Sequence, residues 1–266
     1  MRHAHHSLLP HRERPRRRMA ANYPVLLAQA RRRLRQHAED AGCSLLDGLV
    51  ACWPMNEASG SRLDVSGQAN HLTSNNSVGS TEGLLGDAAA LNSASNHSLS
   101  IGSNPSLSFG NQAGLSLAMW FNFSPLDTYK ILASKWGATI PEMEFNLQVY
   151  APAYDYIVDW QVSDGVDYFS VQTTDIIGDG WWHVVATFDA AAGELQIWLN
   201  GVASPLAGSA SLVTAAATPI VLGAYSTFTG QSTLLIDDTA IWNRRLSAGE
   251  VAMLWNDGDG LAYPFS

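Results

Sequence analysis

The chain has 266 residues, of which 46% are hydrophobic and 15% charged, and its formal net charge is −9. This composition is typical of a globular protein long enough to bury a core. No apolar run approaches the roughly 20 residues needed to span a membrane, and the basic N-terminus lacks the apolar segment of a secretory signal peptide. We therefore expect no membrane span.

The N-terminal region is basic, whereas the rest of the chain is acidic. Residues 1–42 contain ten Arg against three acidic residues, and the remaining residues contain five Lys or Arg against twenty-one acids. Residues 1–21 have no periodicity and are rich in His, Pro and Arg, which predicts a disordered leader. Met19 is an alternative translation start. Binding of nucleic acid by the basic run is a further alternative, disfavoured because no aromatic residues are interleaved with it.

Residues 22–43 are predicted to form an amphipathic helix and linker. Leu27, Leu34 and Ala41 recur at intervals of seven, and Gly42 is suited to end the helix. The apolar face is narrow, so we expect the helix to dock on the body, or on another subunit in a homo-oligomer or larger assembly, through residues 22–41. Anchoring on a membrane surface is the alternative.

After residue 44, short apolar segments recur between turns rich in Gly, Asn, Ser and Pro. In "LSLAMWFNF", residues 115–123, larger apolar residues occupy every second position. Ten or more such segments predict a two-sheet antiparallel sandwich.

The segment "GDGWWHVVATFDAAAGELQIWLNGV", residues 178–202, predicts a β-hairpin. Trp182 and Val184 lie on one face of its first strand and His183 on the other, while Gly193 lies in the turn. Trp182 is expected in the core, and His183 is expected to be a structural hydrogen-bonding residue rather than a catalytic group or metal ligand.

One short helix is predicted near the C-terminus. Ser247 and Glu250 form the pattern of a capping box, and the sequence "NDGDG", residues 256–260, ends the helix rather than forming a calcium loop. Cys43 and Cys52 are the only cysteines. They fit no zinc motif, and Cys52 is interpreted as a small core residue, with a Cys43–Cys52 bridge as the alternative.

Three segments resemble, in order, parts of the laminin G-like, concanavalin A-like lectin–glucanase superfamily. They are "GLVACWPMNEASGSRLDVSGQANHLT", "GWWHVVATFD…GELQIWLNG" and "LLIDDTAIWNRRLSAGEVAMLWNDGDG", which together cover roughly residues 46–262. The resemblance implies an all-β fold: a concanavalin A-like jelly-roll sandwich of two antiparallel sheets over residues 44–266, with the N-terminal helix and the short C-terminal helix added. It also implies a glycan- or protein-binding module, often with one structural calcium ion.

Four residues are candidate calcium ligands by this resemblance. Asp64 and Asn70 lie in the loop after the first strand, and Asp237 and Asp238 lie in the closing strand. Calcium prefers carboxylate, amide and backbone oxygens. Adjacent acids in an apolar strand also require a partner. Asp237 and Asp238 point to opposite faces, and the sequence does not choose between them. Alternatively, Asp64 and Asn70 form turns and the two strand acids accept hydrogen bonds from loop amides.

The segment "VYAPAYDYIVDW" is the predicted ligand-binding surface. It brings Tyr150, Tyr154, Asp155, Tyr156 and Trp160 together around a loop, where exposed aromatic rings could stack on sugars. Tyr129 and Trp136, and likewise Tyr225 and Phe228, flank other loops. The alternative is that these aromatics simply cover the sheets.

No catalytic motif is found. The E-x-D-x-x-E pattern of related glycan hydrolases is absent, since Glu142 and Glu144 are followed only by Gln148, and no G-x-S-x-G elbow occurs. We therefore expect a non-catalytic recognition or adhesion module that binds surface glycans or a protein partner on a virion, outside the cell or on a cell surface. The alternatives are a structural decoration protein without sugar binding and, less favoured, a glycan hydrolase or lyase.

Overall fold

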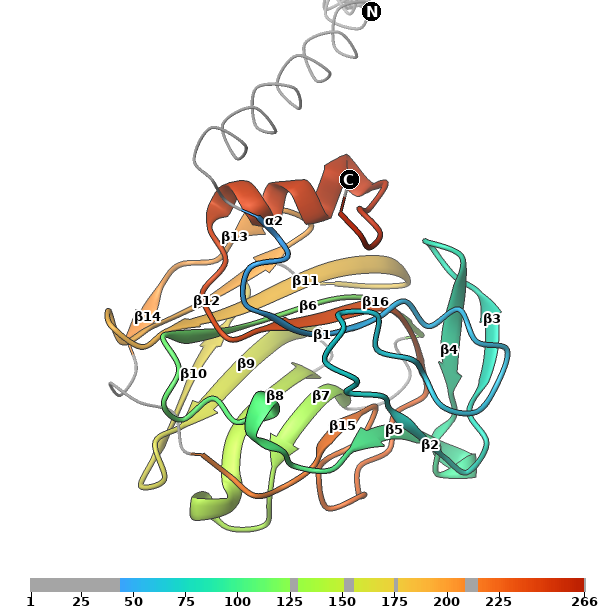
Figure 1. The fold of residues 1–266 in the computed structure, drawn as a ribbon, viewed down its shortest axis with the longest axis horizontal. Helices are drawn as coiled ribbons and strands as arrows, with labels where there is room; N and C mark the ends of the chain where they lie inside the picture. Colours follow the sequence, from blue (N-terminus) through green and yellow to red (C-terminus); the bar gives the residue numbers. More distant parts are fainter. Residues whose placement is uncertain (1–43, 125–128, 151–155, 175–176, 209–214, 266) are drawn as a thin grey trace, which may run out of the picture.

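Two antiparallel β-sheets pack face to face in the protein (Figure 1). The computed structural model describes residues 44–124, 129–150, 156–174, 177–208 and 215–265. The pairing of the strands into two antiparallel sheets confirms the predicted all-β sandwich. The leader and the predicted helix over residues 22–43 lie outside the described residues.

The larger sheet has nine strands in the order β13-β12-β11-β6-β16-β4-β3, with β1 paired to β16 and β14 paired to β12. Its strands are β1 (Leu49–Trp53), β3 (Gly79–Glu82), β4 (Asp87–Leu91), β6 (Gly114–Phe123), β11 (Gly180–Asp189), β12 (Glu194–Leu199), β13 (Val202–Ala203), β14 (Ala207–Gly208) and β16 (Leu234–Trp242).

The smaller sheet has seven strands in the order β10-β9-β8-β7-β15-β5-β2. These are β2 (Thr73–Asn75), β5 (Ser98–Ile101), β7 (Tyr129–Trp136), β8 (Met143–Tyr150), β9 (Ile157–Ser163), β10 (Tyr168–Gln172) and β15 (Ile220–Leu222). Short 3-10 turns connect some of the strands: η1 (Ser93–Ser95), η2 (Pro105–Leu107) and η3 (Ile140–Glu142). A further 3-10 turn, η5 (Asn256–Gly258), follows the last strand and the C-terminal helix.

The predicted hairpin is present as β11 and β12, and β11 pairs with the central strand β6 of the larger sheet. Val184 lies opposite Leu199 on β12 and Met119 on β6. Val184 belongs to the core between the sheets, whereas its neighbour Val185 faces the other side of the sheet. The period-two pattern thus assigned both faces correctly, because successive side chains of a strand point to opposite sides.

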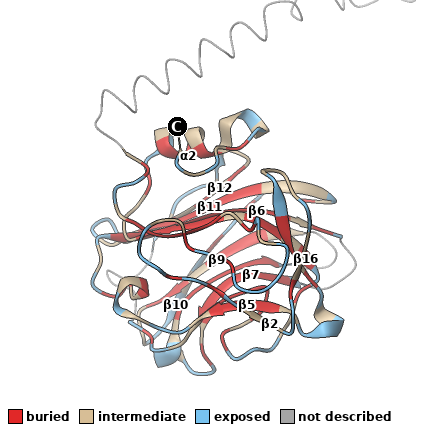
Figure 2. Cartoon of the chain, turned by 45° about the vertical axis from the view of Figure 1, so that its right-hand side comes forward, coloured by how far each residue is buried: buried red, intermediate tan, exposed pale blue. Residues whose placement is uncertain are grey.

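The core lies between the two sheets. Figure 2 shows buried residues along the strands of both layers and exposed residues at loops and turns. Leu117 and Phe121 on β6 face Phe145 on β8 and Trp160 on β9 within one continuous apolar cluster, and all four are fully buried. Removal of this apolar surface from water on folding is the main stabilising term of such a sandwich.

A second apolar cluster lies on the outer face of the larger sheet, beneath helix α2 (Ala248–Trp255) (Figure 1). The predicted capping box is present, with the Ser247 and Glu250 side chains each accepting from the other's backbone amide. Asn256 ends the helix in the left-handed conformation. Cys52 is a free, buried thiol in this cluster. No helix in the described part of the chain is both long and apolar enough to cross a membrane.

His183 lies under the same helix, as a core residue. It is 2% exposed, and its ring centroid is 4.9 Å from that of Trp120 and 6.1 Å from that of Trp255. Burial lowers the pKa of His183 to about 3, so the imidazole is neutral at physiological pH. The preceding residue, Trp182, was expected in the core but is half-buried at its margin. Its indole N–H donates to the carbonyl of Gly178 at 2.9 Å.

A buried ion pair joins β7 to β8. Lys135 Nζ lies 2.6 Å from Glu144 Oε2, and neither side chain is exposed. Lys135 also donates to the carbonyl of Leu107, and Glu144 accepts from the amides of Phe109 and Ala216. These bonds tie two loops to the end of the smaller sheet.

Candidate functional site

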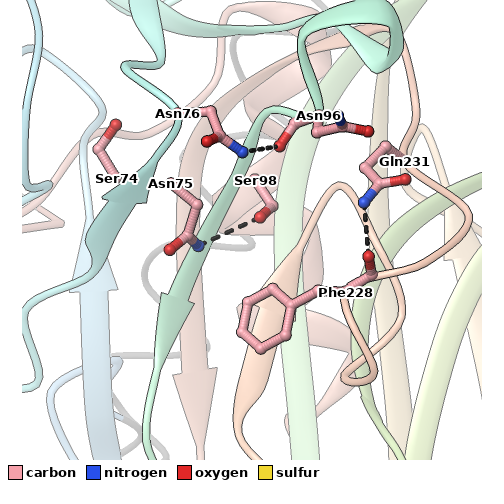
Figure 3. A pocket seen from close by; sticks show the side chains of 7 residues that line it. All are labelled: Ser74, Asn75, Asn76, Asn96, Ser98, Phe228 and Gln231. Atoms are coloured by element: carbon pink, nitrogen blue, oxygen red, sulfur yellow. Dashed lines mark hydrogen bonds between the residues drawn. The ribbon is translucent and has the colours of Figure 1, made fainter.

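An open pocket lies at the edge of the smaller sheet, beside β2 and β5. It has a volume of about 630 Å³, within the range of small-molecule sites. Strand β2, the start of β5 and the loop between β15 and β16 supply its walls (Figure 3). The lining residues are amides, hydroxyls and one aromatic ring: Ser74, Asn75, Asn76, Asn96, Ser98, Phe228 and Gln231.

Three of the lining residues have a left-handed backbone. The φ angles are +61° at Asn76, +53° at Asn96 and +56° at Phe228. Asparagine adopts this conformation readily, whereas a bulky residue there is uncommon and costs about 1–3 kcal/mol. The strain at Phe228 therefore requires support from its surroundings.

Hydrogen bonds within the loop supply that support. The amide of Phe228 donates to the carbonyl of Tyr225 at 2.8 Å, and the amide of Tyr225 donates to the carbonyl of Thr229 at 2.9 Å. Gln231 Nε2 donates to the carbonyl of Phe228 at 2.6 Å. The tight turn leaves the Phe228 side chain 44% exposed. An apolar ring is thus presented at the pocket by a strained and well-bonded turn.

The pocket amides are oriented by the protein. Asn75 Nδ2 donates to the hydroxyls of Ser98 at 3.1 Å and Ser100 at 2.9 Å, and Asn76 Nδ2 donates to the carbonyl of Asn96 at 2.8 Å (Figure 3). Asn75 uses both of its N–H groups in these bonds, whereas Asn76 uses one of its two. Gln231 likewise uses one N–H, which donates to the carbonyl of Phe228. The side-chain carbonyl oxygens of all three residues are left as acceptors.

A second hollow of about 530 Å³ lies around Asn104 and Gln112. It is also polar, but no aromatic side chain lines it. The pocket beside Phe228 therefore combines more of the features that recognise a hydroxyl-rich ligand with an apolar face.

The structure places Asp64 and Asn70 together in a hydrogen-bonded loop. Asp64 Oδ1 accepts from the amides of Cys52 and Ser66, and Oδ2 accepts from the Ser66 hydroxyl and the amide of Asn70, each at 2.9 Å. The Asn70 side chain donates to the carbonyl of Val50 and accepts from Asn104. Protein donors, which a cation would displace, therefore occupy these oxygens.

Asp237 and Asp238 lie at an irregularity in β16, and their side chains have separate surroundings. Asp237 Oδ2 accepts from the amides of Leu84 and Leu85 at 2.8 and 2.9 Å. Asp238 has a φ of +40° and one buried oxygen without a partner. Burial, aided by the neighbouring Asp237 charge, raises the pKa of Asp238 to about 7.

In the part of the chain that the structure describes, no group of three or more His, Cys, Asp or Glu residues is placed to hold a metal ion. The contacts of Asp64 and Asp237 match the alternative that they accept hydrogen bonds from loop amides. Calcium binding stays a prediction.

The residues of the predicted aromatic surface lie in different surroundings, and the structure describes only three of the five. Tyr150 is 41% exposed on β8, across from the 42% exposed Tyr129 on β7. Tyr156 is half-buried and packs on Phe123, with ring centroids 5.6 Å apart. The prediction that Trp160 faces a ligand is wrong. Its indole is fully buried in the core and donates to the carbonyl of Thr187. Tyr154 and Asp155 lie outside the described residues.

Sequence reasoning noted Phe228 only as an aromatic flanking a loop. The asparagines at 75, 76 and 96 carried one signal, since Asn is enriched where the backbone turns left-handed. Their convergence was invisible because β2, β5 and the loop before β16 are distant in sequence and meet only through sheet pairing.

Comparisons with known proteins agree with this architecture. A family model of the concanavalin A-like lectin/glucanases superfamily matches residues 92–252, which is more than half of the chain. The chain belongs to this superfamily. The search of curated proteins found no match to the chain.

Solved structures with a similar fold include binding domains of clostridial toxins. The binding domain of Paraclostridial Mosquitocidal Protein 1 has a TM-score of 0.66 and 18% identity, covering 80% of this chain and 53% of that one. The botulinum neurotoxin serotype D binding domain has a TM-score of 0.63 and 14% identity, covering 80% and 52%. The botulinum neurotoxin DC binding domain, solved with rat synaptotagmin II, has a TM-score of 0.61 and 11% identity, also covering 80% and 52%. The chain thus spans about half the length of each of these binding domains. At these sequence identities the likeness concerns the fold alone.

Proposed function

We propose that the chain is a non-catalytic recognition module that binds glycans in the pocket beside Phe228. One observation carries the proposal: an exposed aromatic ring is held at a strained φ within a wall of oriented amides and serines. Observed backbone strain of this kind concentrates at functional sites. A sugar has an apolar C–H face suited to the ring and hydroxyls suited to the amides.

The similar toxin domains support a binding role. The botulinum neurotoxin DC binding domain is solved in complex with SialylT in one structure and with rat synaptotagmin II in another. For this chain we propose a surface glycan as the ligand, met outside the cell, on a cell surface or on a virion. A protein partner, or a purely structural decoration role, is the alternative outcome of the tests below.

The contacts of the two glutamates that the sequence analysis considered for catalysis support a non-enzymatic role. Glu144 is bound to buried Lys135, and Glu142 accepts from the amides of Ala138 and Thr139. None of the seven pocket residues is acidic, so the pocket lacks the pair of carboxylates that glycoside hydrolysis uses.

Binding of the full chain to a broad glycan array, with and without Phe228→Asn, tests the proposal. Asparagine adopts the left-handed conformation more readily than phenylalanine, so this variant removes the ring while relieving the strain. We expect glycan binding to be lost and Tm to be unchanged or higher. Phe228→Tyr is the matched control, since it keeps the ring and should keep binding. Equal retention by wild type and Phe228→Asn, or no retention of any glycan, contradicts the proposal.

A further inference from the structure

We infer that the ligand of the Phe228 pocket is an uncharged saccharide, and that glycans recognised through a carboxylate, sulfate or phosphate are excluded. This inference rests on the proposed glycan binding and names its ligand class. It follows from two independent observations: where the hydrogen-bond donors of the pocket are directed, and where the cationic side chains of the body lie.

The first observation is the polarity of the pocket wall. The amide nitrogens of Asn75, Asn76 and Gln231 all donate to protein oxygens. Their carbonyl oxygens line the pocket without a protein donor, and Figure 3 shows them pointing away from those hydrogen bonds. Carbonyl oxygens accept hydrogen bonds from sugar hydroxyls, whereas an anion placed among them would be repelled. The second N–H of Asn76 and of Gln231, the Asn96 amide and the serine hydroxyls are neutral donors and complete a site for hydroxyl groups.

The second observation is that residues 44–266 hold no freely exposed Lys or Arg side chain. This part of the chain contains five such residues, and the structure describes all of them. Arg62, Lys130 and Lys135 are at most 1% exposed. Arg244 is paired with Glu250, and Arg245 is paired with Glu194 and Asp189.

Sites for anionic sugars need a charge-assisted partner, most often an arginine fork that binds the carboxylate or sulfate. Here every such fork is already used, and twenty-one acidic residues against five cations give residues 44–266 a strongly negative potential. An anionic glycan would meet general repulsion from the body and no compensating local contact. The binding of an uncharged sugar is not weakened by this negative potential.

The decisive experiment compares uncharged oligosaccharides with sialylated and sulfated ones on the full chain, at about 50 and 500 mM salt. We expect binding to uncharged hexose or N-acetylhexosamine oligomers that changes little with salt and falls at least about tenfold in Phe228→Asn.

Phe228-dependent binding of a sialylated or sulfated glycan would overturn the inference while leaving the proposed glycan function intact. Absence of Phe228-dependent binding to either class removes the proposed function as well. Anion binding through the arginine-rich residues 1–42 is recognised separately, since it persists in Phe228→Asn and disappears at 500 mM salt.

Discussion

Replacing Asp64 with alanine tests whether this residue is a structural acceptor or a metal ligand. Its carboxylate accepts four hydrogen bonds, two of them from the backbone amides of Cys52 and Asn70 in buried surroundings. A hydrogen bond to a charged group contributes about 1.5–3 kcal/mol, and bonds that share one carboxylate do not add fully. We therefore expect Asp64→Ala to lower the free energy of unfolding by about 3–5 kcal/mol. Ser66→Ala, which removes one of the four bonds, should cost about 1 kcal/mol.

Thermal unfolding of the full chain, with calcium and with a chelator, measures both effects. A domain of this size loses roughly 2–4 °C of Tm per kcal/mol, so the Asp64→Ala loss is about 10 °C. The structural interpretation requires the same loss in both buffers. Calcium would stabilise the native state by RT ln(1 + [L]/Kd) if Asp64 were a ligand. A calcium-dependent rise in Tm of the wild type that disappears in Asp64→Ala would refute the reasoning and confirm the calcium prediction.

Three further predictions concern other groups. Lys135→Met should lower the free energy of unfolding by about 3–5 kcal/mol in denaturant titrations, because it leaves the Glu144 carboxylate buried without its cation; the double change with Glu144→Leu should recover much of the loss, and an unchanged single variant would contradict the buried pair. The folded-state pKa of Asp238, about 7, lies above its ordinary value of 3.8, so its contribution to stability is fully present below pH 3.8 and is lost as pH rises through 7; Asp238→Asn should therefore be more stable than wild type at pH 8, with a difference that shrinks towards pH 4, and a difference independent of pH would count against the raised pKa. Tyr150→Ala should leave glycan binding on the array unchanged if the ligand lies at Phe228, and a loss there would instead support the aromatic surface predicted from the sequence.

The interpretation of the sequence succeeded where neighbouring residues decide the outcome. Alternation along residues 115–123 and 182–188 assigned faces correctly because a strand points successive side chains to opposite sides. The Ser247–Glu250 capping box marked the start of α2 because both partners lie within one helical turn. The order of three short segments identified the superfamily, which the family model then matched over residues 92–252.

The candidate site depended on contacts between distant residues. Trp160 was read as a ligand-facing aromatic, yet the pairing of β9 within the sheet points it into the core. Asp64 suited calcium by residue type, but whether its oxygens are available depends on the amides of Cys52 and Asn70 that converge on it. Residue type does not reveal which donors a carboxylate has already accepted.

The sequence by itself determined the β-sandwich class, the short C-terminal helix and the division between a basic leader and an acidic body, because each follows from local periodicity or composition. Only the tertiary structure brought Asn75, Asn96 and Phe228 to one pocket, directed the pocket amides inward to the protein, and paired or buried all five cations of the body. The physical reason is that sheet pairing joins segments about 25 to 125 residues apart, and hydrogen-bond partners across such distances are set by the folded arrangement rather than by neighbouring residues.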